Sequence, residues 1–372
     1  MRVLVDATAI PVHRGGVGRY VDELTRALAA AGIDVVVACR PSDESAFAAA
    51  VERAVPVAAA RWRGSRLLWE QFRLPRLVRT VRPDVLHCPH YTIPRSPGVP
   101  VVVTIHDATF FTRPDLHTWV KGPFFRRATR IALHRAARCV VPSSATAHAL
   151  VQRVGADERK LTVAHLGADL SFFTAPAPED VAKLRTAYDL GDGPFVAFLG
   201  TLEPRKNVPA LIEGFVAAFR DDEQAPTLVL AGGSGWDHSI ASAVEAARKH
   251  VRVVSTAYLP LEQVPALLGG AAVVVYPSLD EGFGLPVLEA MACGAAVLTT
   301  RRGSLPEVGG DAVAYTEPDA ASIGAALRSL VADPDRRAEL SAAGPQRARG
   351  FTWAASANAH IEAFEAAIGS DR

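Results

Sequence analysis

The feature that most constrains the fold is an alternation, found twice along the chain, of short β-branched runs with longer segments of helical period. This pattern is typical of repeated strand–helix units around parallel sheets. In the first half we expect strands near Arg2–Asp6, Asp34–Cys39, Asp84–His87, Val99–Ile105, Arg138–Pro142 and Lys160–His165. The helices expected there are Arg19–Ala31, Trp119–Ala137 and Ala145–Val154.

The alternation starts afresh after Ala168–Pro194, a stretch rich in Ala, Pro, Asp and Gly that we interpret as a stiff connector. The strands expected next are Phe195–Leu199, Thr227–Ala231, Arg252–Ser255, Ala271–Tyr276, Ala296–Thr299 and Ala312–Tyr315. The helices expected among them are Val208–Phe219, Ile240–Lys249, Leu261–Leu268 and Pro286–Ala292. The C-terminal part, Ala320–Leu330 and Asp335–Ile368, is predicted to be helical with a break at Gly344-Pro345.

The length of the chain, 372 residues, exceeds the size at which one hydrophobic core keeps growing. We expect an N-terminal domain at residues 1–175, a C-terminal domain at 190–350, and a helix at 351–372 that packs back on the first domain. The fold class is α/β, with two doubly wound, Rossmann-like domains. Ligands of such sheets bind at the carboxyl ends of the strands, so the domains should face each other across a cleft.

Composition and cysteine pattern favour a cytoplasmic protein. Hydrophobic residues make up 49% of the chain and charged residues 21%, close to globular averages. Asp6 interrupts any apolar signal region, and the apolar stretch Ala266–Pro277 is too short for a membrane helix. The 4 cysteines show neither a pairing rhythm nor zinc spacing, so we interpret them as buried packing residues.

A first candidate binding feature is a glycine loop between the first strand and the first helix, His13-Arg14-Gly15-Gly16-Val17-Gly18-Arg19-Tyr20. Glycines let the backbone approach a phosphate closely, and a helix N-terminus presents unpaired N–H groups to an anion. Val21 stands where the third glycine of a dinucleotide fingerprint would pack. A flexible strand-to-helix turn is therefore the alternative interpretation.

A second feature, Gly200-Thr201-Leu202-Glu203-Pro204-Arg205-Lys206-Asn207, directly follows the first strand of the second half. At the carboxyl end of a strand, Arg205 and Lys206 could hold a diphosphate and offset the charge that grows on it as it leaves. The alternative is a loop of solvated charges in which Asn207 caps the next helix.

The third and strongest feature is Ser278-Leu279-Asp280-Glu281-Gly282-Phe283-Gly284-Leu285-Pro286-Val287-Leu288-Glu289-Ala290-Met291. Pro286 suits the first position of a helix, which places Glu281 in a loop and Glu289 in the first helical turn. Each carboxylate can accept hydrogen bonds from two vicinal hydroxyls, as recognition of a sugar or ribose requires. Exposed backbone N–H groups would suit a phosphate at Gly282, Phe283, Gly284 and Leu285. The alternative is a surface acid and a partner of the helix dipole.

These three features, in this order, resemble the retaining family-4 glycosyltransferases of the GT-B fold, and the resemblance covers nearly the whole chain. The signature of that family is an acid pair separated by seven residues, which Glu281 and Glu289 match. The resemblance implies that Glu281 holds hydroxyls of the donor sugar, Glu289 the ribose, and Arg205 and Lys206 the diphosphate. It also implies a nucleotide-diphosphate sugar as donor substrate, with no cofactor and no metal.

By the same resemblance, Gly16 approaches the diphosphate, Gly200 belongs to the donor loop, and His106 matches the family's histidine at the sugar site. His106 stands in Thr104-Ile105-His106-Asp107 at a strand end, and a satisfied core histidine is the alternative. Thr201 departs from the pattern, since many members have Arg there. The phosphate must then be held by Arg205 and Lys206.

The resemblance implies transfer of a sugar to an acceptor hydroxyl with retention of anomeric configuration. Mannose or glucose transfer in cell-envelope glycan or glycolipid synthesis is the expectation that we favour, although the sequence leaves the base, the sugar and the acceptor open. Because no carboxylate is placed as a covalent nucleophile, a front-face displacement is implied, in which the departing phosphate helps to deprotonate the acceptor. Asp333-Pro334-Asp335 begins a predicted helix, so we interpret it as a cap and not as a metal site.

Charge is unevenly distributed along the chain. Through Asp169 there are 24 Lys and Arg against 14 Asp and Glu, and the remainder has 16 against 25. Two basic segments, Arg61–Arg82 and Lys121–Arg138, combine arginine with aromatic and leucine side chains, as surfaces that rest on anionic lipid do. Our hypothesis is that the N-terminal domain meets a lipid-linked or phosphorylated acceptor at the inner membrane face. An arginine-rich outer helix face is the alternative, and nucleic acid is not expected because no recognition motif accompanies the charge.

Other functions make different demands on the sequence. A nicotinamide-dependent oxidoreductase needs a full GxGxxG and an acid closing the next strand, but Cys39-Arg40 ends that strand. A non-catalytic GT-B paralogue acting as a partner would be expected to lack Glu281, Lys206 or His106, which are all present. A GT-B sugar-nucleotide epimerase or a phosphorylase stays open as an alternative.

Overall fold

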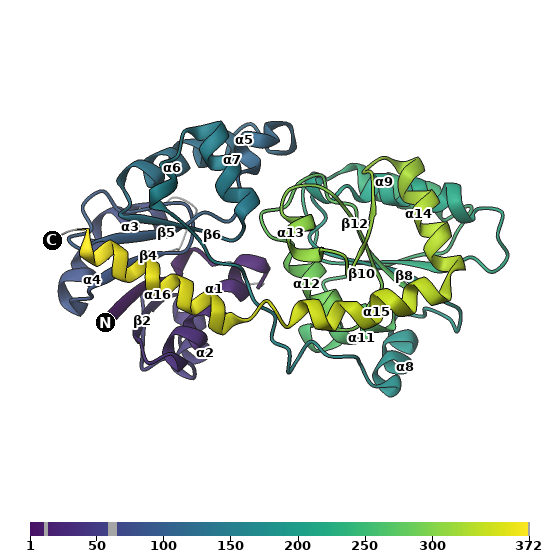
Figure 1. Ribbon diagram of the computed structural model, residues 1–372, viewed down its shortest axis with the longest axis horizontal. Helices are drawn as coiled ribbons and strands as arrows, with labels where there is room; N and C mark the ends of the chain where they lie inside the picture. Colours follow the sequence, from purple (N-terminus) through teal and green to yellow (C-terminus); the bar gives the residue numbers. More distant parts are fainter. Residues whose placement is uncertain (11–13, 59–64, 371–372) are drawn as a thin grey trace. The chain divides into compact units, whose positions relative to one another are not determined.

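The computed structural model describes residues 1–10, 14–58 and 65–370, and the chain divides into two compact units (Figure 1). Unit 1 comprises Met1–Gly167 together with Trp353–Arg372, and unit 2 comprises Ala168–Thr352. Each unit is an α/β structure around a parallel sheet, which confirms the fold class expected from the alternating sequence pattern.

Among the residues described, the sheet of unit 1 has seven strands, all paired in parallel. In spatial order they are β3 (Arg53–Pro56), β2 (Asp34–Cys39), β1 (Arg2–Asp6), β4 (Val85–Cys88), β5 (Val101–Thr104), β6 (Arg138–Val141) and β7 (Leu161–Val163). The central strands are short runs of Val and Leu that are buried, as expected of a parallel sheet covered on both faces. The register pairs Val3 with Val35 on one side and Val85 on the other.

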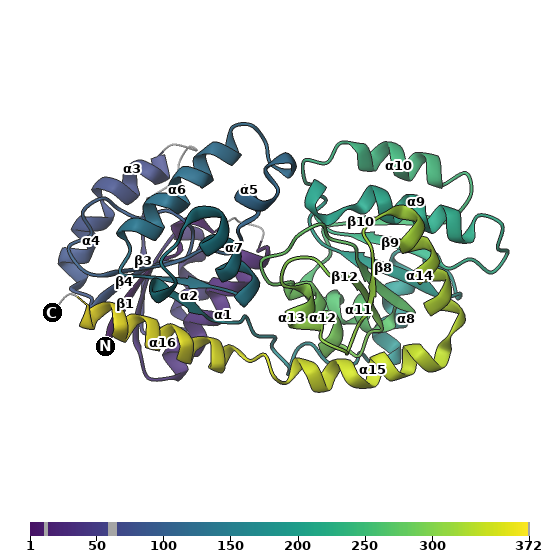
Figure 2. The same cartoon turned by 45° about the horizontal axis from the view of Figure 1, so that its top comes forward.

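The helices of unit 1 cover both faces of this sheet. They are α1 (Gly16–Ala30), α2 (Glu44–Ala48), α3 (Ser65–Phe72), α4 (Leu74–Val81), α5 (Thr109–Thr112), α6 (Lys121–Arg135), α7 (Ser144–Val154) and α16 (Trp353–Gly369). Figures 1 and 2 show α1, α2 and α16 on one side of the sheet and α3, α6 and α7 on the other. The last helix, α16, packs against α1 and strands β4 to β7, so it contributes to the core of unit 1.

In the described part of unit 2, the sheet has six parallel strands. Their order is β10 (Val253–Ala257), β9 (Thr227–Ala231), β8 (Phe195–Leu199), β11 (Val273–Tyr276), β12 (Val297–Thr300) and β13 (Ala314–Thr316). The helices are α8 (Pro178–Ala187), α9 (Val208–Phe219), α10 (Ser239–Ala247), α11 (Val264–Gly270), α12 (Leu285–Ala292), α13 (Leu305–Gly309), α14 (Ala320–Ala332) and α15 (Pro334–Ala348). Helices α9 and α14 approach closely because Gly214 faces Gly324, where an added Cβ would meet backbone.

Both sheets are doubly wound, and each has a point where the strand order reverses direction. In unit 1 this point lies between β1 and β4, and in unit 2 it lies between β8 and β11. Loops that leave the carboxyl ends of such neighbouring strands diverge, and the crevice between them is the usual ligand site of an open α/β sheet. The fold therefore singles out the loops after β8 and β11, and those after β1 and β4.

Several predicted elements are confirmed with the same bounds, including Arg2–Asp6, Phe195–Leu199 and Val208–Phe219. The predicted break at Gly344-Pro345 is wrong, because α15 runs through both residues and ends at Ala348. Gly344 packs on α12, where an added Cβ would lie 2.9 Å from the carbonyl oxygen of Met291. This close contact accounts for the glycine without a break in the helix.

The sequence also failed to predict some elements. Strand β3 and the short helices α2 to α4 were not expected, and α8 lies inside the stretch that we interpreted as a connector. Helix α8 begins with Pro178 at its first turn and has two acidic residues there, a favourable start that the surrounding Ala-Pro composition obscured.

Candidate active site

The loop after β8 places two cations at the reversal point of the unit 2 sheet. A short 3-10 turn at Pro204–Lys206 is followed by Asn207 in the left-handed region, at φ 57°. The Asn207 side chain does not cap α9; its Nδ2 donates to the carbonyl oxygens of Pro277, at 3.2 Å, and Pro318, at 2.7 Å. The first of these bonds ties the β8 loop to the end of β11.

Lys206 and Arg205 do not project into solvent, so the alternative of a loop of solvated charges is wrong. The Lys206 side chain is only 9% exposed and that of Arg205 only 17%. Lys206 Nζ lies 2.5 Å from Glu281 Oε1, and Arg205 forms an ion pair with the other carboxylate oxygen of Glu281. The structure therefore brings Glu281 together with two cations that lie 75 and 76 positions earlier in the sequence.

The surroundings of Glu281 keep this carboxylate ionised. Burial raises its pKa, but the charges of Arg205 and Lys206 outweigh burial, with hydrogen bonds from Lys206 and from Ser278 at 2.8 Å, and the pKa falls to about 2. Arg205 also donates to Glu203 Oε1 at 2.7 Å. Two cations and two carboxylates thus form one buried network, in which each charge has an opposite partner.

The loop that carries Glu281 is supported by the segment after β12. Ser304 donates to the carbonyl oxygen of Glu281 from its backbone N–H at 3.1 Å and from its hydroxyl at 3.0 Å. Gly303, at φ 55°, lies so close that an added Cβ would be 2.4 Å from that same oxygen. We did not predict this support from the sequence, although Gly303 and Ser304 follow β12 as a typical turn signal.

Two details of the third sequence feature differ from expectation. Gly284, at φ 96°, precedes a helix that begins at Leu285, so Pro286 is the second helical residue and Glu289 lies in the second turn, not the first. The residues Gly282, Phe283, Gly284 and Leu285 are buried, whereas we expected exposed backbone N–H groups there. Glu289 is also buried, at 1% exposure. The loop is buried because the apolar side chains of Phe283 and Leu285 pack into the protein interior.

A second glycine loop, which the sequence reading did not single out, packs on the β8 loop. An added Cβ at Gly232 would lie 2.0 Å from the carbonyl oxygen of Gly200, and one at Gly235 would lie 1.9 Å from that of Leu202. Gly200 N–H donates to Ala231 O at 2.9 Å. Only glycine permits this approach, so the loop after β9 holds the loop with Arg205 and Lys206 in place.

The glycine loop of unit 1 lies at the start of α1. His13 falls outside the described residues, and Gly16 is the first residue of the helix, after Gly15 as N-cap. Both Gly15 and Gly16 are exposed, and an added Cβ would meet nothing within 4 Å. At Gly18, by contrast, an added Cβ would lie 2.9 Å from the Arg14 side chain. Gly18 therefore serves packing, whereas Gly16 offers open backbone.

His106 follows β5 and is half-buried at the carboxyl edge of the unit 1 sheet. Burial lowers the pKa of its imidazole, only partly opposed by the Pro89 carbonyl and by Asp107, so the ring is neutral near pH 7. Nε2 lies 2.7 Å from the Pro89 carbonyl oxygen, which can only accept. Nε2 therefore carries the hydrogen, and Nδ1 has a lone pair that can accept a hydrogen bond.

An ion triad at the end of β1 was not predicted from the sequence. Arg66 lies 3.2 Å from Asp6 and 2.7 Å from Glu70, and it also donates to Thr92 at 3.1 Å. Burial raises the pKa of Glu70 in spite of the Arg66 charge. The triad joins the loop ends after β1 and β4, which are the strands at the reversal point of this sheet.

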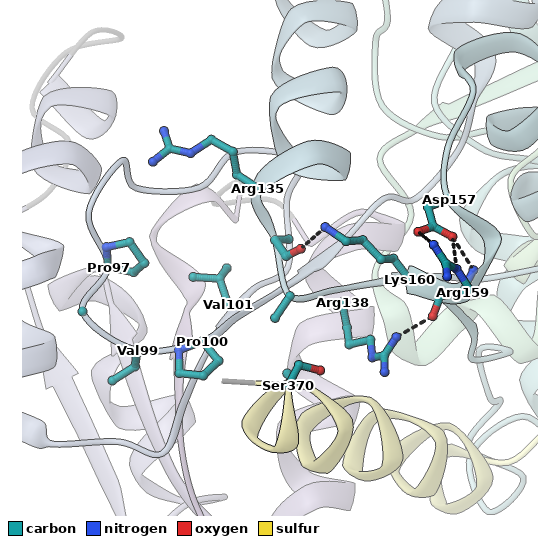
Figure 3. Close-up of a pocket in the computed structure, with 14 residues that line it drawn as sticks. Pro97, Val99, Pro100, Val101, Arg135, Arg138, Asp157, Arg159, Lys160 and Ser370 are labelled. Carbon is teal, nitrogen blue, oxygen red and sulfur yellow. Dashed lines mark hydrogen bonds and ion pairs between the residues drawn. The ribbon is translucent and has the colours of Figure 1, made fainter. Parts of the chain in front are cut away.

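A cavity of about 700 Å³ in unit 1 lies at the opposite edge of this sheet, where β5 and β6 begin (Figure 3). Its cations include Arg138 and Lys160. Lys160 Nζ donates to the carbonyl oxygens of His134, at 3.1 Å, and Ala136, at 3.2 Å, and Arg138 donates to that of Arg159. These cations thus satisfy carbonyl groups at the C-terminal end of α6 and before β7, and we do not assign the cavity to the active site.

Two smaller expectations are confirmed. Asp333 caps α15, accepting a hydrogen bond from the N–H of Arg336 at 2.9 Å, as the interpretation of Asp333-Pro334-Asp335 required. The cysteines, Cys39, Cys88, Cys139 and Cys293, are buried.

Among the described residues, no cluster of three or more potential metal ligands is present, and no helix has the length and apolar character needed to cross a bilayer.

Two parallel sheets, with two cations and a carboxylate at the reversal point of the second, fit a sugar-transferring enzyme of the GT-B type. Two family models match the chain: Glycosyltransferase Family 4 over residues 14–172 and Glycosyl transferases group 1 over residues 181–347. The chain belongs to glycosyltransferase family 4, as the resemblance predicted, and it is a glycosyltransferase.

Relatives that match 80% or more of the chain support the same assignment. The glycogen synthase of Mycobacterium tuberculosis is 30% identical over 424 residues, covering 100% of this chain and 96% of that protein. The O-antigen chain mannosyltransferase B of Escherichia coli is 28% identical and covers 80% of each chain. Among solved structures, Anabaena HepE in a complex with UDP and glucose has a TM-score of 0.78 at 17% identity, covering 97% of this chain and 98% of HepE. This likeness shows the GT-B fold.

Proposed function

We propose that this glycosyltransferase takes its sugar from a nucleotide-diphosphate donor and transfers it to an acceptor hydroxyl with retention of anomeric configuration. The observation that carries the proposal is the network of Arg205, Lys206 and Glu281 at the reversal point of the unit 2 sheet. The structure of HepE with UDP-glucose, a protein of the same fold, supports a donor of this class.

The network has the chemistry that a diphosphate ester needs. An ammonium group has three N–H donors and a guanidinium has five, so both cations can contact phosphate oxygens while they still contact Glu281. Charge grows on the diphosphate as the sugar departs, and two preorganised cations in a largely buried setting stabilise it. In this proposal the cations, and not a metal ion, offset that charge.

Glu281 has a second role in the proposal. Its carboxylate stays ionised over the whole physiological range because the pKa is held at about 2, so it can accept hydrogen bonds from sugar hydroxyls but cannot act as an acid. Glu289 would bind the ribose, and the loop residues Gly200 and Gly282 to Leu285 would contact the donor. The proton of the acceptor hydroxyl would pass to the departing phosphate on the same face of the sugar, which preserves the configuration.

Unit 1 would contribute Gly16 and His106 to donor recognition. Gly16 offers exposed backbone at a helix N-terminus, which suits an anion. The neutral ring of His106 presents Nδ1 as an acceptor, so we expect it to receive a hydrogen bond from a sugar hydroxyl and not to donate a proton.

The acceptor is proposed to reside at an anionic membrane surface. Of the large apolar side chains exposed in the described part of unit 1, Trp119 (87%) and Phe124 (42%) lie at or just before α6, and Phe72 (65%) lies on α3. Along α6, Phe124, Arg127 and Ile131 follow at helical spacing and are all exposed, which mixes apolar and cationic groups on one face. Arg61 and its neighbours through residue 64 lie outside the described residues.

The names of two relatives support a class of product. Their names, O-antigen chain mannosyltransferase B and D-inositol 3-phosphate glycosyltransferase, each state an acceptor or a product. The second, from Kribbella flavida, is 31% identical over 398 residues, covering 95% of this chain and 91% of that protein. We therefore propose a hexosyl transfer, with mannose or glucose tested first, onto a lipid-linked or phosphorylated acceptor of glycan synthesis.

The test is a product assay with purified protein, a panel of UDP-, GDP- and ADP-hexoses, and lipid-linked or phosphorylated acceptors, with and without EDTA. We expect one donor to yield a glycoside whose anomeric configuration, by NMR, equals that of the donor, with no loss in EDTA. An inverted product would overturn retention. A changed nucleotide sugar without acceptor would indicate an epimerase, and binding without turnover would indicate a non-catalytic paralogue.

A further inference from the structure

A buried chain of hydrogen bonds in unit 1 joins the last helix to the sheet edge where His106 lies. Tyr20 Oη, on α1, lies 2.7 Å from Thr104 Oγ1 and 2.8 Å from Nε2 of His360 on α16. Thr104 Oγ1 lies 2.9 Å from Nε2 of His87 on β4. All four side chains are buried at 1% exposure or less. Buried polar groups need hydrogen-bond partners, so in this hydrogen-bond network each donor is restricted to one acceptor.

His360, on α16, determines which atoms donate and which accept in this hydrogen-bond network. The Ser356 carbonyl oxygen lies 2.7 Å from His360 Nδ1 and can only accept, so Nδ1 carries a hydrogen. Burial lowers the pKa of His360 to about 4, so the ring is neutral near pH 7 and Nε2 holds a lone pair. Burial raises the pKa of the Tyr20 hydroxyl, which keeps its hydrogen. Tyr20 therefore donates to His360.

The donors and acceptors of the other two hydrogen bonds follow from this one. Because the Tyr20 hydrogen points to His360, Tyr20 Oη accepts from the hydroxyl of Thr104. Thr104 Oγ1 then accepts from Nε2–H of His87. Burial lowers the pKa of His87 well below its usual range, so this ring is also neutral, with its hydrogen on Nε2. One carbonyl group on α16 thus orients every hydrogen bond as far as β4.

The hydrogen-bond network acts on His106 in two ways. The Tyr20 ring packs edge-on against the His106 ring, with centroids 5.0 Å apart and planes at 84°. Thr104 is the last residue of β5, two positions before His106, so its side chain anchors the strand end from which His106 departs. The edge contact with Tyr20 and the hydrogen bond from Nε2 to Pro89 together fix the orientation of the imidazole.

We propose that Tyr20, Thr104 and His360 are positioning residues that hold His106 with Nδ1 available to a substrate hydroxyl. This inference rests on the proposed function, in which His106 contacts the donor sugar. It assigns a role to α16: this helix follows all of unit 2 in the sequence, yet its His360 helps to orient a candidate site residue of unit 1.

A first experiment tests the hydrogen-bond network without reference to activity. Histidine-labelled full-length protein is observed by NMR at pH 7.5, and the ring nitrogens are assigned with single His→Gln variants. We expect the hydrogen on Nδ1 of His360 and on Nε2 of His87 and His106. A hydrogen on Nε2 of His360, or a charged ring, would overturn the inference even if the protein transfers sugar. If no sugar is transferred, the proposed function fails while this result stands.

A second experiment tests positioning by a double-mutant cycle. Tyr20→Phe removes only the hydroxyl, and we expect it to lower kcat/KM about tenfold, the size of one lost hydrogen bond, when His106 is present. In a His106→Ala background the same change should cost less than about twofold, since the residue it positions is gone. Equal losses in the two backgrounds would contradict the proposal.

Two variants separate positioning from simple destabilisation. His360→Gln keeps an oxygen that can accept from Tyr20, so we expect its kcat/KM to stay near wild type, whereas His360→Leu should resemble Tyr20→Phe. Equal activity of the two His360 variants would count against the proposal. Thr25→Val is the matched control, because among the described residues this buried hydroxyl of α1 donates only to Val21 O and Asp22 O of its own helix. Its loss should leave kcat/KM unchanged.

Discussion

The side chains at the reversal points of the two sheets differ in their charge. In unit 2 the edge has two cations, Arg205 and Lys206, balanced by carboxylates that a diphosphate can partly replace. In the described part of unit 1, Arg66 at the corresponding edge lies between two carboxylates, and the neutral ring of His106 follows β5. The side chains of the unit 2 edge suit an anion, whereas the neutral His106 side chain of unit 1 suits a hydroxyl group.

This local difference runs against the overall charge. The chain is basic through Asp169 and acidic beyond it, yet Arg205 and Lys206, the cations of the proposed diphosphate site, lie in the acidic part. The surplus arginines of unit 1 lie largely on outer helices such as α6, where Arg127 and Arg130 are exposed. Net charge therefore informs us about surface partners, and the site chemistry depends on which charges the loops bring together.

The largest expected effect is that of Glu281→Gln. We expect kcat/KM to fall about 10³-fold, because the sugar loses a charged acceptor in a buried site. Binding of the nucleoside diphosphate should be kept or strengthened, since the two cations lose their competing carboxylate. Steady-state kinetics and calorimetry measure the two quantities. Glu213→Gln, on the exposed face of α9, is the control. Parallel losses of binding and transfer would refute this division of roles.

The opposite pattern is expected for Lys206→Met. Removal of one buried cation should weaken nucleoside diphosphate binding about 100-fold, the typical value of a charge-assisted hydrogen bond in such a setting. His106→Ala should leave this binding within about twofold, because the histidine is assigned to hydroxyls. Calorimetric titration of both variants makes the comparison, with Lys249→Met, an exposed lysine, as control. If His106→Ala weakened binding as much as Lys206→Met, the contrast between the edges would be lost.

A smaller effect concerns the surface of unit 1. Phe124→Ser should reduce co-sedimentation with vesicles containing anionic lipid about tenfold, because a partly exposed aromatic ring contributes roughly 1 to 2 kcal/mol on insertion. Tyr258→Ser, an exposed aromatic of unit 2, should have no effect. Binding that is equally strong to neutral vesicles, or unchanged by Phe124→Ser, would reject the membrane proposal.

The smallest expected effect per residue is a difference in the acid sensitivity of the two units. Burial lowers the pKa of His360 to about 4 and that of His90 to about 3, so the unfolded state binds more protons once the pH falls below about 6.5. Unit 1 should therefore lose stability from about pH 6.5 downward. Glu281, with a pKa of about 2, stabilises the folded state above about pH 4.5, and this contribution is lost as the pH falls toward 2.

Hydrogen exchange followed by unit checks this prediction. Between pH 6.5 and 5 we expect protection to fall in unit 1 by on the order of 1 kcal/mol per buried neutral histidine, while unit 2 changes little. His360→Gln should reduce the loss in unit 1. A loss that begins in unit 2 would show that the histidines are not the acid-sensitive groups.

Much of the fold could be predicted from the sequence for a physical reason. Buried parallel strands are short runs of Val, Leu and Phe, so Phe195–Leu199 and Thr227–Ala231 were predicted with correct bounds. The loops with Arg205 and Glu281 were found because each follows such a strand and contains glycine. The pairing of Glu281 with both cations was not predicted; only their presence at the same edge was.

What the sequence could not show depends on contacts between distant segments. Tyr20 and His360 are 340 positions apart, and no local pattern pairs them. Arg66, Asp6 and Glu70 are likewise joined only by the fold. The roles of Gly232 and Gly303 become visible only through the carbonyl groups that they approach. Strand β3, at the sheet edge, has few apolar residues and ends in Pro56, so its signal was weak.

Calorimetric titration of the wild-type protein with matched nucleoside mono- and diphosphates tests the central claim most directly. The account predicts that at least one diphosphate binds ten or more times as tightly as its monophosphate, roughly 1.4 kcal/mol, and that Lys206→Met abolishes this preference. Equal affinity for the two nucleotides, or a preference that survives without Lys206, would contradict it.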